Sequence, residues 1–365
     1  MRARRFSWAL AAAAVLTSRA SAARAEFPPA RNYRTVELAP GVFAFISPET
    51  NGPIPSGNVT VVVGDDGALV VDSGRFPTLA RRMIAEIRRR TDKPVRFLVH
   101  THWHLDHIAA DAEFQKAFPG MTFLATDFTR RKMLEKQVAS LHDIEKNDRG
   151  YVEQIEALVD RGKRDDGSPI PEEAMRYLRD EVADIRLEIA ELSGATVVAP
   201  QTTFDRSATV YLGKREVRTV FLGSGNTAGD AVVYVPDAKV AATGDLLVAP
   251  VPYGYGCHPA EWIETLKKLT ALDVAAIVPG HGPVMRDWSY AKKVTGLLEA
   301  VRARVGEAIR AGSTLEETQK RVDLDDFRKT FAGDDYGRGR AFRDFFARDA
   351  VARAWQEARG QLAEE

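Results

Sequence analysis

Three of the seven histidines of the chain, His102, His104 and His107, stand close together with Asp106, directly after the apolar run Val95–Val99. A run of this kind suits a buried strand, and in α/β proteins reactive side chains gather on loops beyond the carboxyl ends of such strands. Alternate residues of an extended segment share one side, so the first two histidines can reach one metal ion. Asp106 and His107 follow a bend and can point toward a second ion. We therefore expect a fold built around a metal-binding loop, with zinc as the expected metal and iron or manganese as alternatives.

The spacing H-x-H-x-D-H of this cluster resembles the metal-binding motif of the metallo-β-lactamase superfamily. Three other strand ends fit the same resemblance, one before the cluster and two after it. It implies that Asp72 supports the metal loop, that Asp245 bridges two metal ions and that His281 binds the second ion. The resemblance covers about residues 36–283 and leaves out a group of helices within that range. The ligands that it implies are His102, His104, Asp106, His107, Asp245 and His281.

One position departs from the family pattern. The stretch G-H-T-x-G-D, which in the family supplies a third histidine to the first metal, here reads Gly225–Asp230 with Asn226 in the place of the histidine. An amide oxygen is neutral and binds zinc less well than imidazole does. Three interpretations stay open. Asn226 binds the first metal or its water, the first metal is absent or of another kind, or Asn226 is a plain turn residue.

The chemistry that the resemblance implies is hydrolysis by a metal-activated water. In that hypothesis Asp106 orients the nucleophile and later passes a proton to the leaving group. Tyr253 and Tyr255 follow the Asp245 loop and are weaker candidates for lining a substrate pocket or donating to an oxyanion, with simple packing as the competing interpretation.

The predicted function is therefore that of a metal-dependent hydrolase with one or two zinc ions, acting on an acyl or ester-type bond such as a β-lactam or a lactone. The asparagine argues against a typical dizinc β-lactamase. Two alternatives stay open, because a fold alone does not choose a reaction. One is a mononuclear iron oxygenase that uses His102, His104 and Asp245, and the other is a non-catalytic metal-binding relative.

The hydrophobic pattern predicts an α/β domain over residues 26–285. Short strands are expected within residues 36–72, with the hairpin turn Gly64–Gly67 between two of them. A helix follows over residues 79–90, and strands and helices alternate again after residue 197. Two successions of strands and helices, each ending in a histidine-bearing loop, predict an αββα sandwich.

Two helical regions are predicted outside this pattern. Residues 128–193 are long, charged and amphipathic, and Leu178 and Val182 begin an apolar face that repeats at three- and four-residue steps. This region predicts an inserted helical hairpin, which serves as a lid, as packing or as the contact of a homodimer. Residues 286–365 predict a helical C-terminal extension, in which Ser313–Glu316 is expected to form a capping box.

The N-terminus has the three parts of a secretory signal peptide. Met1–Arg5 is basic, Phe6–Leu16 is apolar but too short to span a bilayer, and Ala23–Ala25 offers a cleavage site of small residues. We therefore predict a signal peptide over residues 1–25. The mature protein is expected in the periplasm or outside the cell, with no stable membrane anchor.

Charge and cysteine content limit the partners. The 51 basic and 51 acidic side chains balance, which leaves no electrostatic footprint for nucleic acid. Cys257 is the only cysteine, so the chain holds no internal disulfide and depends on its core for stability. The expected partner is a small-molecule substrate.

Overall fold

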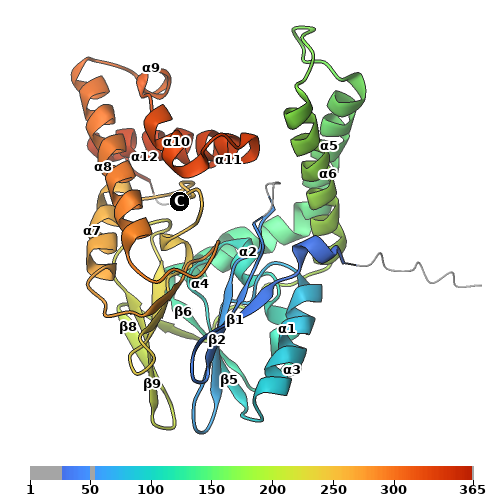
Figure 1. The fold of residues 1–365 in the computed structure, drawn as a ribbon, viewed down its shortest axis with the longest axis vertical. Helices are drawn as coiled ribbons and strands as arrows, with labels where there is room; N and C mark the ends of the chain where they lie inside the picture. Colours follow the sequence, from blue (N-terminus) through green and yellow to red (C-terminus); the bar gives the residue numbers. More distant parts are fainter. Residues whose placement is uncertain (1–26, 50–53, 364–365) are drawn as a thin grey trace, which may run out of the picture.

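The computed structural model describes residues 27–49 and 54–363, so the predicted signal peptide lies outside the described residues. Two β-sheets pack face to face, and helices cover both outer sides (Figure 1). The predicted αββα sandwich is therefore confirmed, together with the helical insertion and the helical C-terminal extension.

The first sheet has seven strands in the spatial order β1-β2-β3-β4-β5-β6-β7. They are β1 (Arg34–Ala39), β2 (Val42–Ile46), β3 (Val59–Val63), β4 (Ala68–Val71), β5 (Val95–Val99), β6 (Thr122–Thr126) and β7 (Thr202–Phe204). β1 to β4 are antiparallel, and β4 to β7 are parallel. The carboxyl ends of β4 and β5 therefore meet at one edge of the sheet, where Asp72 and the histidine cluster follow.

The second sheet has five strands in the order β12-β11-β10-β9-β8. They are β8 (Ser207–Leu212), β9 (Arg215–Phe221), β10 (Ala231–Val235), β11 (Val240–Ala242) and β12 (Ala276–Val278). β11 and β12 pair in parallel, whereas the other pairs are antiparallel. Asp245 follows β11 and His281 follows β12, so both residues come from the same edge of this sheet.

Strand β2 shows how one strand serves two layers. Val42 and Ala44 face the second sheet, in a core made of aliphatic residues from both sheets. Phe43 and Phe45 face the opposite side, against helix α1 (Pro77–Arg90). Because side chains alternate along a strand, an uninterrupted apolar run marks a strand that is covered on both faces. Helix α3 (Asp111–Ala117) completes the cover of this side through Phe114.

The outer face of the second sheet is covered by α7 (Pro259–Leu269) and the C-terminal extension. The extension comprises α8 (Ser289–Arg310), α9 (Leu315–Arg321), α10 (Asp325–Ala332), α11 (Tyr336–Ala341), the π-helical segment η4 (Phe342–Ala347) and α12 (Arg348–Ala358). Trp262 of α7 and Phe346 of η4 are both fully buried in this layer, so the extension shares one core with the second sheet. The predicted capping box lies one residue later than expected, because Thr314 and Glu317 form the reciprocal bonds.

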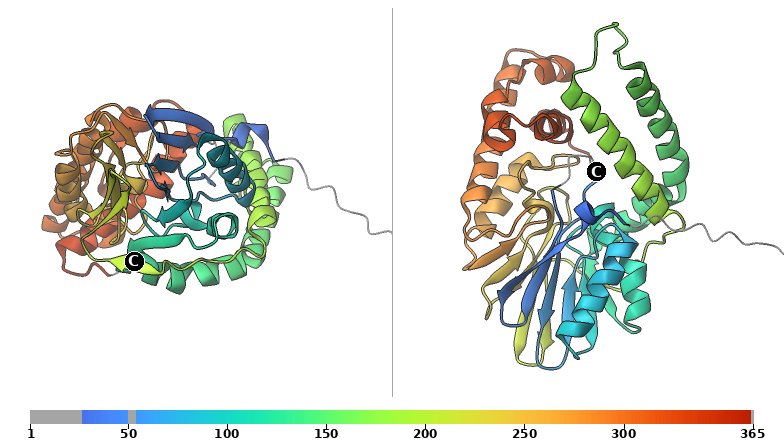
Figure 2. Two further views of the ribbon diagram at one scale, coloured as in Figure 1. Left: turned by 90° about the horizontal axis from the view of Figure 1, so that it is seen from below. Right: turned by 45° about the vertical axis from the view of Figure 1, so that its right-hand side comes forward.

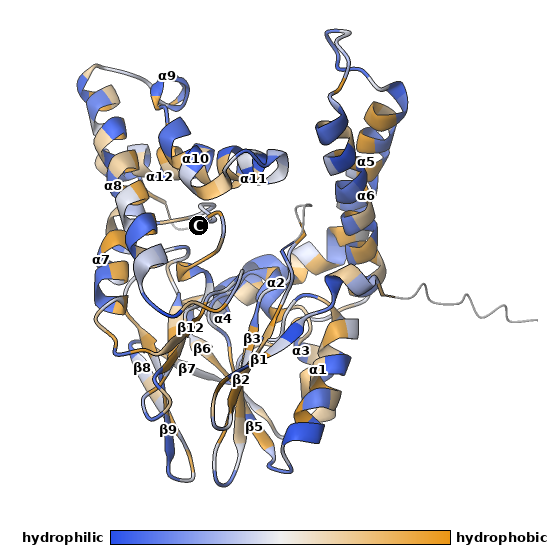
Figure 3. Ribbon diagram, viewed as in Figure 1, coloured by the Kyte–Doolittle hydropathy of each residue, from blue (hydrophilic) through white to orange (hydrophobic). Residues whose placement is uncertain are grey.

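The helical insertion lies between β6 and β7. It comprises α4 (Asp127–Lys132), the π-helical segment η2 (Met133–Gln137), α5 (Val138–Arg161) and α6 (Glu172–Leu192). α5 and α6 pack through a narrow apolar seam that includes Val152, Leu178 and Val182, while hydrophilic residues cover much of their outer surface (Figure 3).

The hairpin of α5 and α6 and the C-terminal helices rise from the same end of the sandwich (Figures 1 and 2). Their facing sides meet where the ring of Tyr177 on α6 lies 6.1 Å from the ring of Tyr336 on α11. The edge of the sheets that carries the metal loops therefore lies between two helical walls. Among the described helices, none combines the length and the apolar character that a bilayer crossing requires.

Candidate metal centre

The four residues of the histidine cluster lie on the segment that follows strand β5 and on the short helix α2 (Leu105–Ile108). The extended segment after β5 carries His102 and His104, and the first turn of α2 carries Asp106 and His107. All four side chains are buried, and those of His102 and His107 are fully inaccessible. The division into two pairs that the sequence suggested differs from this arrangement, because the ring of His107 lies 4.3 Å from that of His102.

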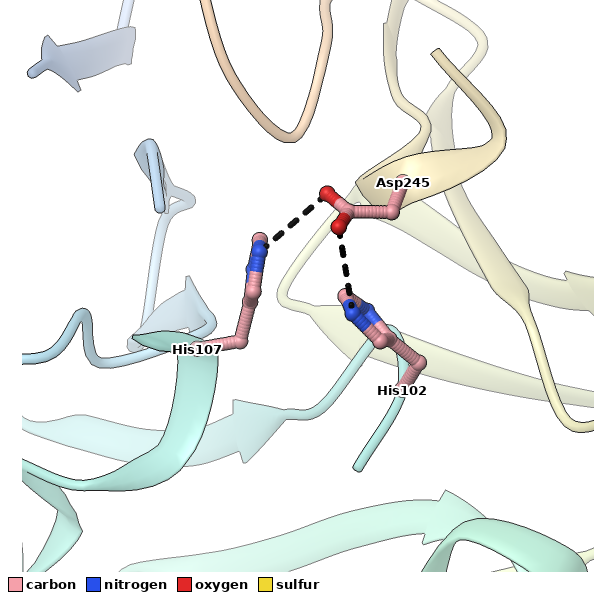
Figure 4. A group of neighbouring side chains, drawn as sticks. All are labelled: His102, His107 and Asp245. Carbon is pink, nitrogen blue, oxygen red and sulfur yellow. Dashed lines mark ion pairs between the residues drawn. The ribbon is translucent and has the colours of Figure 1, made fainter. Parts of the chain in front are cut away.

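Asp245 reaches this cluster from the second sheet (Figure 4). It lies in the 3₁₀ turn η3 (Gly244–Leu246), and its carboxylate lies between two imidazoles. His102 Nε2 is 3.5 Å from Asp245 Oδ2, and His107 Nε2 is 3.2 Å from Asp245 Oδ1. Ligand atoms of these three residues lie within 4.8 Å of one another, so the three can hold one metal ion.

A second group forms around His281, on the loop after β12. His281 Nε2 is 2.8 Å from Asp106 Oδ2 and 3.2 Å from His107 Nε2. Asp106, His107 and His281 again have ligand atoms close enough to share one ion. His107 belongs to both groups, so the two candidate sites overlap.

His104 adjoins the first group, and Asn226 lies behind Tyr253. His104 Nδ1 lies 3.0 Å from His102 Nε2. The side-chain amide of Asn226 is fully buried and donates from Nδ2 to the carbonyl oxygen of Tyr253 at 2.7 Å. Within the described part of the chain, His104 Nε2 and Asn226 Oδ1 are both buried without a hydrogen-bond partner. Both atoms are therefore available as ligands, and the role of Asn226 stays a prediction.

Asp72 supports the cluster from the end of β4. Its Oδ2 accepts hydrogen bonds from His107 Nδ1 and from Thr101 Oγ1, each at 2.8 Å, and its Oδ1 accepts from the Thr101 backbone amide. A carboxylate on the far nitrogen of a metal-binding histidine fixes the tautomer and the orientation of the ring. Asp72 therefore holds His107 with Nε2 facing Asp245 and His281.

Two glycines give the cluster the space that it needs. A Cβ atom at Gly57 would lie 2.6 Å from the ring of His107, and one at Gly280 would collide with Asp245 Oδ1. Both glycines are also fixed by the backbone, since Gly57 donates to the carbonyl oxygen of Asp106 and Gly280 donates to that of Gly244. Any side chain at either position would displace a candidate ligand.

The electrostatics of the centre favour metal binding at the carboxylates. Burial lowers the pKa of His102 to about 4, and His107 adds to this shift. Burial also opposes a charge on His107, but Asp245, Asp106 and Asp72 outweigh it and raise the pKa of that ring well above its usual value. Burial opposes ionisation of Asp106 and Asp245 as well, yet the surrounding histidines hold both pKa values well below the usual range. A metal ion that replaces the proton of His107 would satisfy the same carboxylates.

The donor set fits a metal ion. The Nε2 atoms of His107 and His281 converge, as do His102 Nε2 and His104 Nδ1, and each pair lies beside a carboxylate. Imidazole nitrogens together with carboxylate oxygens suit zinc, and also iron or manganese. The described residues can therefore hold one or two ions at this place.

A cavity of about 380 Å³ opens over the two groups, and its base includes His104, Asp106, Asp245 and His281. Its walls come from the loop after β2, the inserted hairpin, the loop after η3 and the C-terminal extension. These walls include Pro48, Pro55, Gln137, Tyr177, Val248, Pro250, Val251, Tyr253, Arg338, Ala341 and Phe345. Aliphatic and aromatic side chains predominate, so the cavity suits a small substrate with an apolar part.

The two tyrosines of the sequence prediction lie differently. Tyr253 lines the cavity, and its ring lies 5.7 Å from that of His104. Tyr255 is 55% exposed and lies outside the lining of this cavity, so the expectation that it lines the pocket is corrected.

Most residues of the cavity walls escaped the sequence prediction, and Arg75 and Phe345 are two of them. Arg75 lies three positions after Asp72, and Phe345 belongs to the C-terminal extension. A single arginine in a loop gives no sequence signal of a role at the site. Phe345 carries none, because only packing between distant helices brings it to the cavity.

The fold and the buried histidine–carboxylate cluster agree with a comparison against known families. The sequence profile of the metallo-beta-lactamase superfamily matches residues 53–138 and 146–281, more than half of the chain. The chain therefore belongs to the metallo-β-lactamase superfamily.

Individual relatives include enzymes with different substrates. A linear primary-alkylsulfatase from Pseudomonas sp. is 26% identical over 232 residues, which cover 61% of this chain and 40% of that protein. The chain thus matches less than half of the length of this curated relative.

Solved structures with the same fold include a metallo-beta-lactamase and an alkylsulfatase. A metallo-beta-lactamase from Pontibacter korlensis has a TM-score of 0.52 and 20% identity, over 73% of this chain and 99% of that chain. A stereoselective inverting sec-alkylsulfatase from Pseudomonas sp. has a TM-score of 0.59 and 15% identity, over 89% of this chain and 50% of that chain. At these identities the likeness concerns the fold alone.

Proposed function

We propose that the protein is a metal-dependent hydrolase that acts on a small substrate in the cavity between the inserted hairpin and the C-terminal extension. One observation carries the proposal. Two overlapping groups of buried metal-binding side chains, which share His107, lie at the base of a cavity with largely apolar walls. Such an arrangement is suited to hydrolysis in a site that limits access of bulk water.

A metal ion in this centre supplies a water of lowered pKa and polarises the bond to be cleaved. The protein's own groups then have distinct tasks. His102, Asp106, His107, Asp245 and His281 are the proposed ligands, with His104 and Asn226 as further proposed ligands of the first site. Asp106 lines the cavity as well as contacting His281, so it can orient the nucleophile and move a proton to the leaving group.

Zinc is the proposed metal, with one or two ions per chain. The proposed location is the periplasm or the exterior of the cell, on the basis of the N-terminal signal pattern, and the substrate is then a molecule that is met outside the cytoplasm. The apolar wall supports substrates with an apolar part. β-lactams and lactones are candidates from the sequence, and alkyl sulfate esters join them because an alkylsulfatase is a relative.

The first test is metal content, followed by turnover. Protein from cultures supplemented with zinc and iron is expected to hold one or two zinc ions by elemental analysis, and to hydrolyse at least one compound of a panel of β-lactams, lactones and alkyl sulfates. Asp106→Asn is expected to reduce kcat by about 100-fold or more, because the proton-transfer group is lost. His142→Gln, at an exposed histidine on α5, serves as the control with unchanged metal content and rate.

Two results would contradict this proposal. A single iron per chain with oxygen uptake would indicate oxygen chemistry in place of hydrolysis. Full metal loading without turnover of any ester, lactone or sulfate would indicate a metal-binding protein.

A further inference from the structure

Arg75 connects the inserted hairpin to the metal centre. It lies between β4 and α1, lines the cavity, and its side chain is only 11% exposed. Its guanidinium forms an ion pair with Glu188 of α6 and lies 3.8 Å, from Nη2 to Oδ1, from Asp106. Its Nε also donates to the carbonyl oxygen of Pro55 at 2.6 Å. One buried cation thus contacts the hairpin, the loop behind the cluster and a candidate metal ligand.

The two oxygens of Asp106 face different partners. Oδ2 points toward His281 Nε2 at 2.8 Å, as a metal ligand would, and Oδ1 faces Arg75. The distance of 3.8 Å is longer than a charge-assisted hydrogen bond, which has an N···O distance of about 2.7–2.9 Å. Arg75 is therefore close enough to orient the carboxylate but is not bound to it.

Glu188 keeps the guanidinium at this distance. Its side chain is 6% exposed, and its ion pair with Arg75 is the direct link between α6 and the residues of the centre. Without this carboxylate, Asp106 would remain as an acidic side chain within 4 Å of a buried arginine. A guanidinium that pairs with both oxygens of a carboxylate competes with a metal ion for the same lone pairs.

We propose that the docked hairpin controls the metal affinity of the centre through Arg75: Glu188 holds the arginine back from Asp106, and loss of this hold lets the arginine occupy the carboxylate that the metal needs. Arg75 and Glu188 are then positioning residues that act through Asp106. The inference rests on the metal centre of the proposed function but not on any particular substrate.

The chain offers a matched control on the same helix. Asp184, one turn before Glu188 on α6, forms an ion pair with Arg31, which donates to the carbonyl oxygen of Ile54, next to the Pro55 carbonyl that binds Arg75. Glu188→Gln and Asp184→Asn each remove one buried charge that anchors α6. Only the first releases Arg75.

The experiment measures zinc affinity of the full-length protein, freed of metal, in competition with a chromophoric chelator. Glu188→Gln is expected to weaken zinc binding about tenfold or more, the range typical for the partners of metal ligands. Asp184→Asn is expected to leave it within about twofold of the wild type. The double variant Arg75→Gln/Glu188→Gln is expected to recover most of the loss, because the competing cation is gone.

Hydrogen exchange provides a second readout that does not depend on activity. Because coupling between two sites is reciprocal, zinc should slow hydrogen exchange of the amides around Glu188 in the wild type, and this protection should shrink in Glu188→Gln. Equal zinc affinity of Glu188→Gln and wild type, or an equal loss in Asp184→Asn, would overturn the coupling and leave the hydrolase proposal intact. Wild-type protein that binds no zinc would overturn both.

Discussion

At the scale of single residues, the centre depends on side chains that never touch a metal. Asp72 adopts a left-handed backbone conformation, with φ of 60°, and from there its carboxylate reaches both Thr101 and His107. Few residues other than glycine, asparagine and aspartate accept this conformation easily. Of these three residues, only aspartate also offers two acceptor oxygens. Asp72 therefore meets both requirements of this position, the left-handed backbone and the hydrogen bonds to Thr101 and His107.

Asp72→Asn tests this support. Asparagine tolerates the same backbone conformation, so the fold is expected to persist, but an amide accepts through one oxygen only. We expect zinc affinity to fall about 10- to 100-fold, as measured by chelator competition, with a small change in the urea midpoint of unfolding. The matched control is Asp111→Asn in the buried His100–Asp111 pair, which lies outside both ligand groups. An unchanged zinc affinity in Asp72→Asn would show that His107 needs no such support.

The sequence could predict which histidines and carboxylates gather at the centre, because each comes after a strand and is of a distinctive residue type. The structure brings His102, Asp106, His107, Asp245 and His281 into two groups, as the order of strand ends implies. The sequence could not predict the role of Arg75, because a single arginine in a loop has no pattern that distinguishes a solvated charge from a buried one. The exposure of Tyr255 escaped prediction for a similar reason, since one glycine turn decides which side a neighbouring aromatic ring takes.

At the scale of elements, the π-helical segment η4 turns two neighbouring phenylalanines to different tasks. Phe346 is fully buried in the core with α7 and α8, whereas Phe345 lines the cavity over the metal centre. The amide of Gly254, on the loop after η3, donates to the carbonyl oxygen of Phe345 at 2.8 Å. The segment therefore joins the C-terminal extension to the loop after η3, which lines the same cavity.

Truncation of the two phenylalanines should separate these tasks. Phe346→Ala is expected to lower the free energy of unfolding by about 3–5 kcal/mol, because it leaves a cavity in a packed core. Phe345→Ala is expected to cost less stability but to raise KM severalfold for any substrate with an apolar part. Urea unfolding and steady-state kinetics on both variants check this. Similar losses of stability in the two variants would argue against the division.

The periodic apolar face of residues 178–192 was sufficient to predict the inserted hairpin, since a helix that is apolar along one stripe needs a partner. The helices of the extension could be predicted as helices but not as a wall of the cavity. Their position depends on the core that they share with α7, and contacts between segments so far apart leave no local signature.

At the scale of the whole molecule, the extension is tied to the second sheet around His258. This residue precedes α7, and its Nε2 lies 3.5 Å from Nη2 of Arg353 on α12. Burial lowers the pKa of His258 to about 4, and the charge of Arg353 adds to the shift. The histidine thus stays neutral in the folded protein at pH values at which it is charged in an unfolded chain.

This difference predicts acid sensitivity with a definite sign. Between about pH 6.5 and pH 4 the unfolded chain binds a proton at His258 that the folded chain does not, so the free energy of unfolding falls as the pH falls. Because the ring is partly exposed and screened by solvent, the share of His258 between pH 7 and pH 5 is about 1 kcal/mol. Urea unfolding of metal-free protein at both pH values is expected to show a smaller acid loss in His258→Gln than in wild type or His142→Gln. Equal losses in all three would rule out this contribution.

The two sheets each supply part of the metal centre, and His107 and His281 are 174 positions apart in the chain. During synthesis the first histidines therefore emerge long before the last, and they have no complete site to form until the second sheet closes on the first. A metal ion in this centre would therefore stabilise only the arrangement in which both sheets are in place. A bound ion would thus indicate that the two sheets are packed in the correct relative position.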